Sequence, residues 1–288
     1  MKTIRIGGVP EHFNYPWHYG ITNGIFKNEG LSIEWSDVKG GSGAMCKMLE
    51  EGELDIALVL TEGIVKNIHA GSDSRIVQQF VKSPLIWGVH SAPQKGIHAE
   101  DLSSARIARS RIGSGSHLMA YVHAEQQGYD IADSNFVTVG NIDGAIDAFK
   151  NNTADILLWE KFMTQPYVDR NEVKRIGQCI SPWPCFMMVA SGSFLEKNES
   201  LLTALSAAIN ASCKEVIHRA DTVERIAEMY HLELEQVKKW YSSVEWQTSP
   251  WISEKMLQNV ATTLQRVDIL GAEVVSAKEM CVKNAFIY

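Results

Sequence analysis

The chain has 288 residues, of which 45% are hydrophobic and 21% charged. This composition excludes a disordered or fibrous protein, and the length suits about two domains. The 27 Lys and Arg residues are outnumbered by 34 Asp and Glu residues, which gives a net charge of −7. We therefore expect no nucleic-acid binding, since that requires a basic surface for the phosphate backbone. We also expect no membrane insertion, because no apolar stretch approaches the roughly 20 residues of a spanning helix.

The first residues predict a strand rather than a leader sequence. Residues 1–3 run directly into Ile4-Arg5-Ile6, without the basic start, apolar stretch and cleavage site of a secretory signal. We expect a cytoplasmic chain, with a mature periplasmic or cell-surface form that carries a starter Met as the alternative. The 5 cysteines are odd in number and contain no C-x-x-C pair, which indicates structural thiols rather than a disulfide framework or a zinc cluster.

Short apolar segments alternate with longer amphipathic ones over the first two thirds of the chain. This is the pattern of parallel strands linked by crossover helices, so the predicted fold class is α/β. Strands are expected at residues 4–9, 31–35, 55–60, 75–80, 86–90, 106–108, 136–139, 156–159 and 186–190. Helices are expected at residues 15–28, 42–51 and 117–128. After Gly192 apolar residues recur only at helical spacing, which predicts helices that include residues 222–230, 234–241 and 253–270.

Two segments, residues 41–58 and 140–158, resemble each other. Each begins with glycine, continues as a helix and a polar turn, and ends on an Asp-Ile pair that opens a buried strand, at Asp55 and Asp155. Chance similarity within one α/β chain is the alternative explanation. The repeat favours two similar lobes, with a cleft lined by the loops at the C-terminal ends of the strands, where open α/β sheets bind ligands.

Three ordered motifs resemble the substrate-binding proteins of ABC importers for nitrate, alkanesulfonates, taurine and thiamine-pyrimidines. They are GIFKNEGLSIE at residues 24–34, GGSG followed by LEEGELDIA at residues 40–57, and ADILLWEKF at residues 154–162. In the third motif Lys161 replaces the family's usual proline. The resemblance implies a type II periplasmic-binding-protein fold, in which two α/β lobes with mixed sheets, joined by two crossover strands, close over a small molecule.

On that resemblance we expect lobe 1 to contain residues 1–86 and 191–288, and lobe 2 to contain residues 87–190. The crossovers are expected near residues 83–91 and 187–193.

Two glycine- and serine-rich turns before predicted helices are the strongest site candidates. The residues of these two turns are Gly41, Ser42 and Gly43, and Ser114, Gly115, Ser116 and His117. Backbone N–H groups and the helix dipole at such a start attract an anion or a polar group. The alternative is an ordinary capped helix. Neither turn continues into the Lys-Ser/Thr of a nucleotide-binding P-loop.

The loop after the first strand is rich in aromatic and hydrogen-bonding side chains. In the family that the chain resembles, this loop contributes to the pocket, which makes Pro10, His12, Asn14 and Trp17 candidates. The alternative is that the rings only pack onto the following helix.

The ends of the two repeated strands supply further candidates. Trp159 and Glu160 follow the second repeat, and Thr61 and Glu62 occupy the equivalent place after the first. An indole could form a wall of the cleft and a carboxylate could bind an amine or a ring N–H, although a packing pair on the lobe surface is the alternative. Trp183, before the second predicted crossover, could shape the mouth of the cleft or belong to a rigid turn with the following proline.

No catalytic, metal or cofactor site is predicted. Of the 9 histidines, only His12 and His18 lie close together, and their spacing is not that of a zinc site. Cys46 falls inside a predicted helix whose neighbours look buried, which makes it an inert core thiol. A Gly-x-Ser-x-Gly nucleophile elbow is missing.

The sequence therefore predicts a non-catalytic binding protein that captures a small anionic or heteroaromatic molecule by lobe closure. The resemblance adds an ABC permease as its implied partner. One alternative is a cytoplasmic enzyme on the same fold, as in thiamine-pyrimidine or menaquinone metabolism, although the cysteine-rich iron motif of the thiamine-pyrimidine synthases has no counterpart here. The other alternative is a ligand sensor that regulates a partner.

Overall fold

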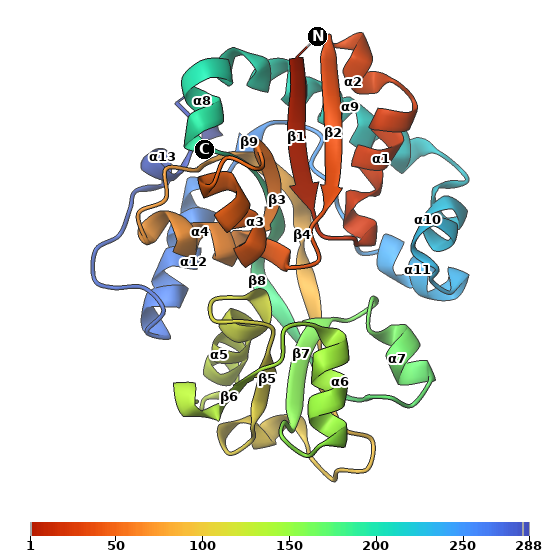
Figure 1. Ribbon diagram of the computed structural model, residues 1–288, viewed down its shortest axis with the longest axis vertical. Coiled ribbons are helices and arrows are strands. Elements are labelled where there is room, and N and C mark those ends of the chain that lie inside the picture. The colour runs from red at the N-terminus through yellow and green to blue at the C-terminus, as the bar shows by residue number, and fades with distance from the viewer. Residues whose placement is uncertain (1, 284, 288) are drawn as a thin grey trace. The chain divides into compact units, whose positions relative to one another are not determined.

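A computed structural model describes residues 2–283 and 285–287 of the chain. Strands and helices alternate up to residue 190, as the sequence predicts (Figure 1). The strands are β1 (Lys2–Gly8), β2 (Leu31–Asp37), β3 (Ile56–Leu60), β4 (Arg75–Ser91), β5 (Ile107–Arg109), β6 (Phe136–Thr138), β7 (Ile156–Glu160), β8 (Lys174–Ala190), β9 (Trp251–Ile252) and β10 (Phe286–Ile287).

Helices join these strands and make up most of the C-terminal third. They are α1 (Tyr15–Thr22), α2 (Ile25–Asn28), α3 (Gly41–Glu50), α4 (Thr61–His69), α5 (Gly115–Gln127), α6 (Ile142–Lys150), α7 (Gln165–Asp169), α8 (Gly192–Asn198), α9 (Leu202–His218), α10 (Thr222–Tyr230), α11 (Leu234–Tyr241), α12 (Glu254–Arg266) and α13 (Ala277–Met280). The prediction of helices alone after Gly192 was wrong at one point, because the short strands β9 and β10 pair with each other.

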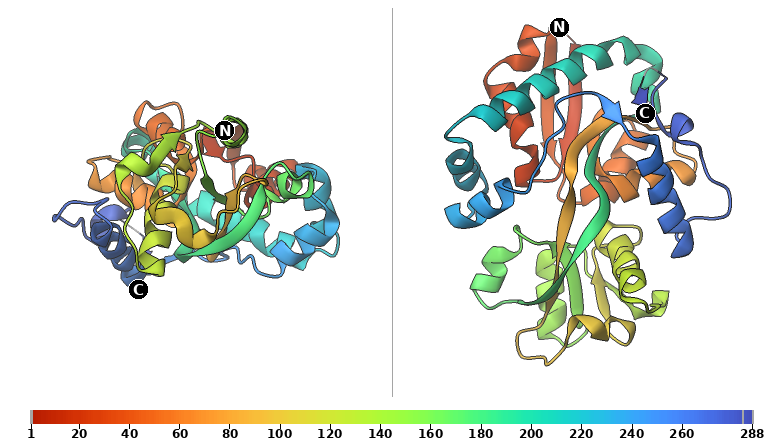
Figure 2. Two further views of the ribbon diagram at one scale, coloured as in Figure 1. Left: turned by 90° about the horizontal axis from the view of Figure 1, so that it is seen from below. Right: turned by 180° about the vertical axis from the view of Figure 1, so that it is seen from behind.

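The main sheet has the strand order β2-β1-β3-β8-β4-β7-β5-β6. The chain divides into two units, the first comprising the described residues within 1–83, 183–262 and 270–288, and the second residues 84–182 and 263–269. Compared with the expected lobes, residues 183–190 lie in unit 1, and residues 84–86 and 263–269 lie in unit 2. The strands β4 and β8, each of 17 residues, are hydrogen-bonded neighbours and run from one unit into the other (Figure 2).

Both long strands were predicted too short. Residues 75–80 and 86–90 were expected as two strands, whereas β4 continues through Pro84, and Leu85 donates its amide to the Ser181 hydroxyl (2.9 Å). Only residues 186–190 of β8 were predicted. Its first half contains Gly177 and Pro182, residue types that argue against a strand, so the pairing with β4 decides its conformation.

The two units share one topology. In unit 1, β1 pairs in parallel with β2 and β3, and β3 pairs antiparallel with the end of β8. In unit 2, β5 pairs in parallel with β6 and β7, and β7 pairs antiparallel with the end of β4. The internal repeat of the sequence therefore corresponds to a repeated structure. The C-terminal edge of the parallel strands in each unit is the place where an α/β sheet binds ligands.

One ion pair occurs in the same form in both units. Asp55 accepts from the backbone amide and the guanidinium of Arg5 (2.8 and 2.7 Å), and Asp155 accepts from the same groups of Arg106 (2.9 and 2.8 Å). Each aspartate precedes the third parallel strand of its unit, and each arginine stands at or just before the central strand. The aspartate of the Asp-Ile pair therefore has a structural role in both units: it links the start of β3 to β1 and the start of β7 to the start of β5.

We expect Asp155→Asn to lower the stability of unit 2 by about 1–3 kcal/mol at pH 7, because charge-assisted hydrogen bonds from Arg106 are lost. These bonds hold the pKa of Asp155 well below its usual range. A carboxyl with a lowered pKa in the folded state stabilises the fold above its unfolded pKa of about 4, and loses this contribution as the pH falls. Urea unfolding at several pH values measures the effect. The exposed Asp147 provides the control substitution, Asp147→Asn, and a deficit of Asp155→Asn that stays constant down to about pH 2 would contradict the assignment.

Candidate functional site

In unit 2, the turn between β5 and α5 forms the N-terminal end of a helix of 13 residues. Gly113 has a φ of +75° and makes the turn, a conformation that favours glycine. Ser114 occupies the N-cap position, but its hydroxyl makes no capping hydrogen bond and donates instead to the carbonyl of Arg111 (2.8 Å). The positive end of the helix dipole is therefore left for another acceptor.

Ser116 is held in the same turn by the end of the strand. Its hydroxyl oxygen accepts from the backbone amide of Ser110 (3.1 Å) and lies 3.1 Å from the hydroxyl of Ser114. Both side chains are buried. Because Ser116 accepts from an amide, its own O–H is free to be directed at Ser114 or at a ligand.

A buried arginine, the last residue of β5, lies next to the turn before α5. Arg109 ends β5, is only 7% exposed, and bonds Asp133 through Nη1 (2.6 Å) and the Thr138 hydroxyl through Nε (3.3 Å). Its guanidinium also lies over the ring of Phe136, 5.1 Å from the centroid. Arg109 was not among the residues predicted from the sequence, although a charged residue at the end of a strand, just before a Gly-Ser turn, is a usable signal.

His117 links Arg109 to the turn. Gly113 donates its amide to His117 Nδ1 (2.9 Å), so in a neutral ring Nε2 carries the hydrogen. This nitrogen lies 3.6 Å from Asp133 Oδ1 and 2.9 Å from Arg109 Nη1, and the second approach is a contact rather than a hydrogen bond because both groups are donors. Two nitrogen donors, Arg109 Nη1 and His117 Nε2, therefore lie next to the turn before α5.

One exposed carboxylate balances this positive charge. Asp133 is 72% exposed at its side chain, and the Arg109 guanidinium keeps the pKa of Asp133 below its usual value. Water screens an exposed carboxylate far better than it screens a buried guanidinium. The net field at the turn before α5 is therefore suited to an anion.

The end of β7, the other candidate in unit 2, is mainly structural. Glu160 is buried and its Oε2 accepts from the amide of Met163 (2.5 Å), which holds the turn after the strand. Trp159 is half-buried and packs against the core cluster that contains Ala148 and Phe149. These contacts agree with the packing alternative for both residues.

In unit 1, the turn before α3 repeats one detail of the turn before α5. Gly41 has a φ of +65°, and the hydroxyl of Ser42 accepts from the amide of Leu60 at the end of β3 (3.0 Å). Ser116 and Ser42 thus hold equivalent positions, the second residue of a helix, and each binds a backbone amide near a strand end. Gly43 follows on the same helix.

The first turn of α4 holds a buried carboxyl. Glu62 is 1% exposed, and its Oε2 accepts from the indole N–H of Trp183 (2.7 Å). Within the described part of the chain its Oε1 has no hydrogen-bond partner. Burial raises the pKa of Glu62 to about 7. The neighbouring Thr61 donates its hydroxyl to the carbonyl of Pro184 (2.5 Å), which fixes the chain beside Trp183.

No metal centre emerges from the residues that the structure describes, since none of their His, Cys, Asp and Glu side chains form a group of three or more. Among the same residues, no helix has both the length and the apolar character needed to cross a membrane.

The comparison with known proteins identifies this topology. A sequence model of the family described as "Ca3427-like PBP" matches residues 87–179. The Candida albicans CA3427 gene product, described as defining a new family with the generic periplasmic binding protein fold, has a similar structure, with a TM-score of 0.91 and 28% identity. The similarity covers 100% of this chain and 98% of that one. The chain has the type II periplasmic-binding-protein fold.

Two binding proteins of lower identity share this periplasmic-binding-protein fold. The alkanesulfonate-binding protein SsuA from Xanthomonas axonopodis pv. citri, bound to MOPS, has a TM-score of 0.79 and 14% identity, over 99% of this chain and 98% of its own. The nitrate-binding protein NrtA from Synechocystis PCC 6803 has a TM-score of 0.71 and 11% identity, over 94% and 83%. None of the curated protein sequences is a significant match. The fold expected from the three sequence motifs is confirmed.

Within the periplasmic-binding-protein fold, the loop after β1 is packed more tightly than the sequence analysis expected. Trp17 is fully buried and stacks on Phe26, with ring centroids 5.2 Å apart and an interplanar angle of 4°. His12 is also fully buried, 4.0 Å from the Trp240 ring, and burial lowers its pKa to about 3. For these two rings the observed contacts agree with the packing alternative, and a contact of either ring with a ligand stays a prediction.

The remaining candidates of this loop have different roles. Asn14 donates to the carbonyl of Val9 (2.7 Å), which fixes the loop, while its Oδ1 is buried without a hydrogen-bond partner among the described residues. Pro10 is half-buried. Tyr230, which the sequence analysis missed, has a buried hydroxyl that also makes no hydrogen bond within the described residues. Tyr230 ends α10, far along the chain from the loop after β1, so no local sequence pattern predicts that it has a buried hydroxyl.

Proposed function

We propose that the protein is a non-catalytic solute-binding protein whose ligand is a small anion or a planar molecule with an anionic group. The observation that carries this proposal is the uncapped N-terminus of α5, backed by the buried guanidinium of Arg109. Helix dipole, hydroxyl groups and guanidinium all favour negative charge. SsuA and NrtA, which share the fold, are described as binding an alkanesulfonate and nitrate, and these are small anions.

The capture mechanism follows from the general behaviour of two-unit binders. A ligand that contacts both units stabilises a closed arrangement that is poorly populated without it. In unit 1, the hydroxyl of Ser42 and the carboxyl of Glu62 are the candidates that we propose for further ligand contacts. An ABC permease remains part of this proposal as the partner, with a ligand sensor as the non-transport version of the same binding chemistry.

A thermal-shift panel of nitrate, methanesulfonate, methylphosphonate, pyrimidines and thiamine phosphates tests the proposal. A true ligand raises the melting temperature further as its concentration increases, because it binds only the folded state. The control is the neutral analogue of each active compound, such as dimethyl sulfone for methanesulfonate. Small-angle scattering with the active compound then tests closure through the radius of gyration. A panel without any stabilising anion would count against the anion site.

One observation favours a second candidate function, an enzyme on the same fold. Glu62 is 1% exposed and its Oε1 has no hydrogen-bond partner among the described residues, and this burial raises its pKa to about 7. Buried carboxyls of this kind act as general acids and bases in many active sites. Incubation of each stabilising compound with the protein, followed by mass spectrometry, separates the two functions. A binder returns the compound unchanged, whereas an enzyme converts it and loses turnover with Glu62→Gln.

A further inference from the structure

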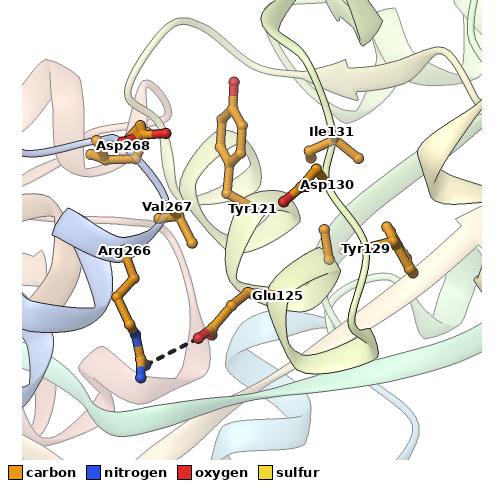
Figure 3. Close-up of a pocket in the computed structure, with 10 residues that line it drawn as sticks. Tyr121, Glu125, Tyr129, Asp130, Ile131, Arg266, Val267 and Asp268 are labelled. Atoms are coloured by element: carbon orange, nitrogen blue, oxygen red, sulfur yellow. Dashed lines mark ion pairs between the residues drawn. The ribbon is translucent and has the colours of Figure 1, made fainter.

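A cavity lies in unit 2, at the end of α5 opposite to the Ser114 turn. Its volume is about 290 Å³, close to the lower limit of ordinary small-molecule pockets. It is lined by the last turns of α5 and the segment that follows, and by the end of α12 with the residues after it (Figure 3). The 13 residues of α5 span about 20 Å, so one small ligand cannot occupy both ends of the helix.

Two helices end at this cavity with the same cap. After α5, Gly128 has a φ of +79°, and the amides of Gly128 and Tyr129 donate back to the last turn of the helix (both 3.1 Å). After α12, Asp268 has a φ of +57°, and the amides of Asp268 and Ile269 donate back in the same way (3.0 and 2.9 Å). The negative ends of two helix dipoles therefore meet at one cavity.

Asp268 is a poor residue for helix capping alone. The left-handed conformation suits glycine, which stands at the equivalent position after α5, and a carboxylate at a helix C-terminus opposes the dipole. Both effects cost stability. A residue that destabilises its own helix end often serves a function. Here Asp268 lines the cavity.

The charges of the lining do not balance. Arg266 and Glu125 neutralise each other, with 3.1 Å between Nη2 and Oε1 (Figure 3). The carboxylates of Asp130 and Asp268 then remain, and both residues are exposed. They add two negative charges to the two helix ends, which makes the cavity attractive to a cation.

The other lining groups define the kind of cation. Tyr121 and Tyr129 contribute aromatic rings, and Ile131 and Val267 contribute aliphatic surface. Aromatic faces attract ammonium groups, and apolar walls suit a hydrocarbon body. A hydrated divalent metal fits less well, because it takes mostly oxygen ligands and leaves the apolar walls without contact.

We propose that this cavity binds an organic ammonium cation with a short apolar or aromatic body. The site lies at the other end of α5 from the proposed anion site and does not rest on the function proposed above; Tyr121 links the two ends, because its ring also packs against His117, with ring centroids 5.3 Å apart. Asp268 and Asp130 hold the ammonium group, and the tyrosine and aliphatic side chains contact the body.

Calorimetric titration with phenethylammonium chloride tests the site, and 2-phenylethanol, which has the same body without the charge, is the matched ligand control. We expect phenethylammonium to bind and 2-phenylethanol to bind at least tenfold more weakly. D268N should weaken phenethylammonium binding about tenfold, because a charge pair is lost. The same substitution should raise the melting temperature of the ligand-free protein by about 1–4 °C, since it removes the negative charge from the C-terminal end of the helix.

D147N is the matched protein control, because Asp147 is an exposed aspartate on α6 of the same unit. The affinity of the D147N variant for phenethylammonium should equal that of the unaltered protein. D130N serves as a second test of the site in case D268N fails to fold, and should also weaken binding. The proposal is overturned if phenethylammonium shows no saturable binding, if 2-phenylethanol binds equally well, or if the folded D268N and D130N variants both keep full affinity.

Discussion

Arg109→Met is expected to weaken binding of the anion found in the thermal-shift panel by about 10- to 150-fold. A charged hydrogen-bonding group near a ligand contributes about 1.5–3 kcal/mol, and methionine keeps much of the side-chain volume and the contact with Phe136 without the charge. Isothermal titration at constant ionic strength measures the change. Arg170→Met is the matched control, because Arg170 is an exposed arginine of unit 2 that pairs with Glu172.

The opposite result is expected for Asp133→Asn. Asp133 partly neutralises Arg109 (2.6 Å), so its removal should strengthen anion binding by about 2- to 5-fold, with the modest size typical of an exposed ion pair. The gain should shrink as salt is added. Effects of opposite sign from two partners of one ion pair distinguish an electrostatic role from structural support. If both substitutions weaken binding equally, the pair only holds the turn together.

The fold could be predicted from the sequence wherever local signals agreed with the tertiary structure. β3 is a continuous apolar run between polar residues, and all of its residues are buried. The Asp-Ile pairs at Asp55 and Asp155 marked two strands that proved equivalent. The first half of β8 could not be predicted, because Gly177 and Pro182 argue against a strand and the pairing with the neighbouring β4 decides its conformation.

The candidate site was predictable only in part, for a related reason. Ser42 and Ser116 could be named as candidates because a glycine-rich turn before a helix is a local signal. The bond between Glu62 and Trp183 joins residues 121 positions apart, so only the fold brings them together. Trp17 shows the converse problem: an aromatic residue near a strand end suits a pocket or a core equally well, and the sequence does not reveal which face of α1 is covered.

The second large effect is expected from Glu62→Gln, which should stabilise the ligand-free protein by about 2–3 kcal/mol at pH 8. Burial raises the pKa of Glu62 to about 7, whereas the unfolded chain has a glutamate pKa of about 4.3. A carboxyl with a raised pKa binds more protons in the folded state, so its contribution to stability is complete below pH 4 and is lost as the pH rises through 7. The amide of the variant carries no charge, and its carbonyl can still accept from the Trp183 indole.

Urea unfolding from about pH 4 to pH 8 measures this prediction. The difference between the variant and the unaltered protein should be small at the acidic end and grow until about pH 7. Glu11, whose pKa burial also raises to about 7, titrates in the same range and is unaffected by the substitution, so some pH dependence should remain. Glu53→Gln, at an exposed site of unit 1, should leave the profile unchanged. A Glu62→Gln profile parallel to that of the unaltered protein would mean that the pKa of Glu62 is the same in the folded and the unfolded chain, and its proposed use as a general acid or base near neutral pH would have to be abandoned.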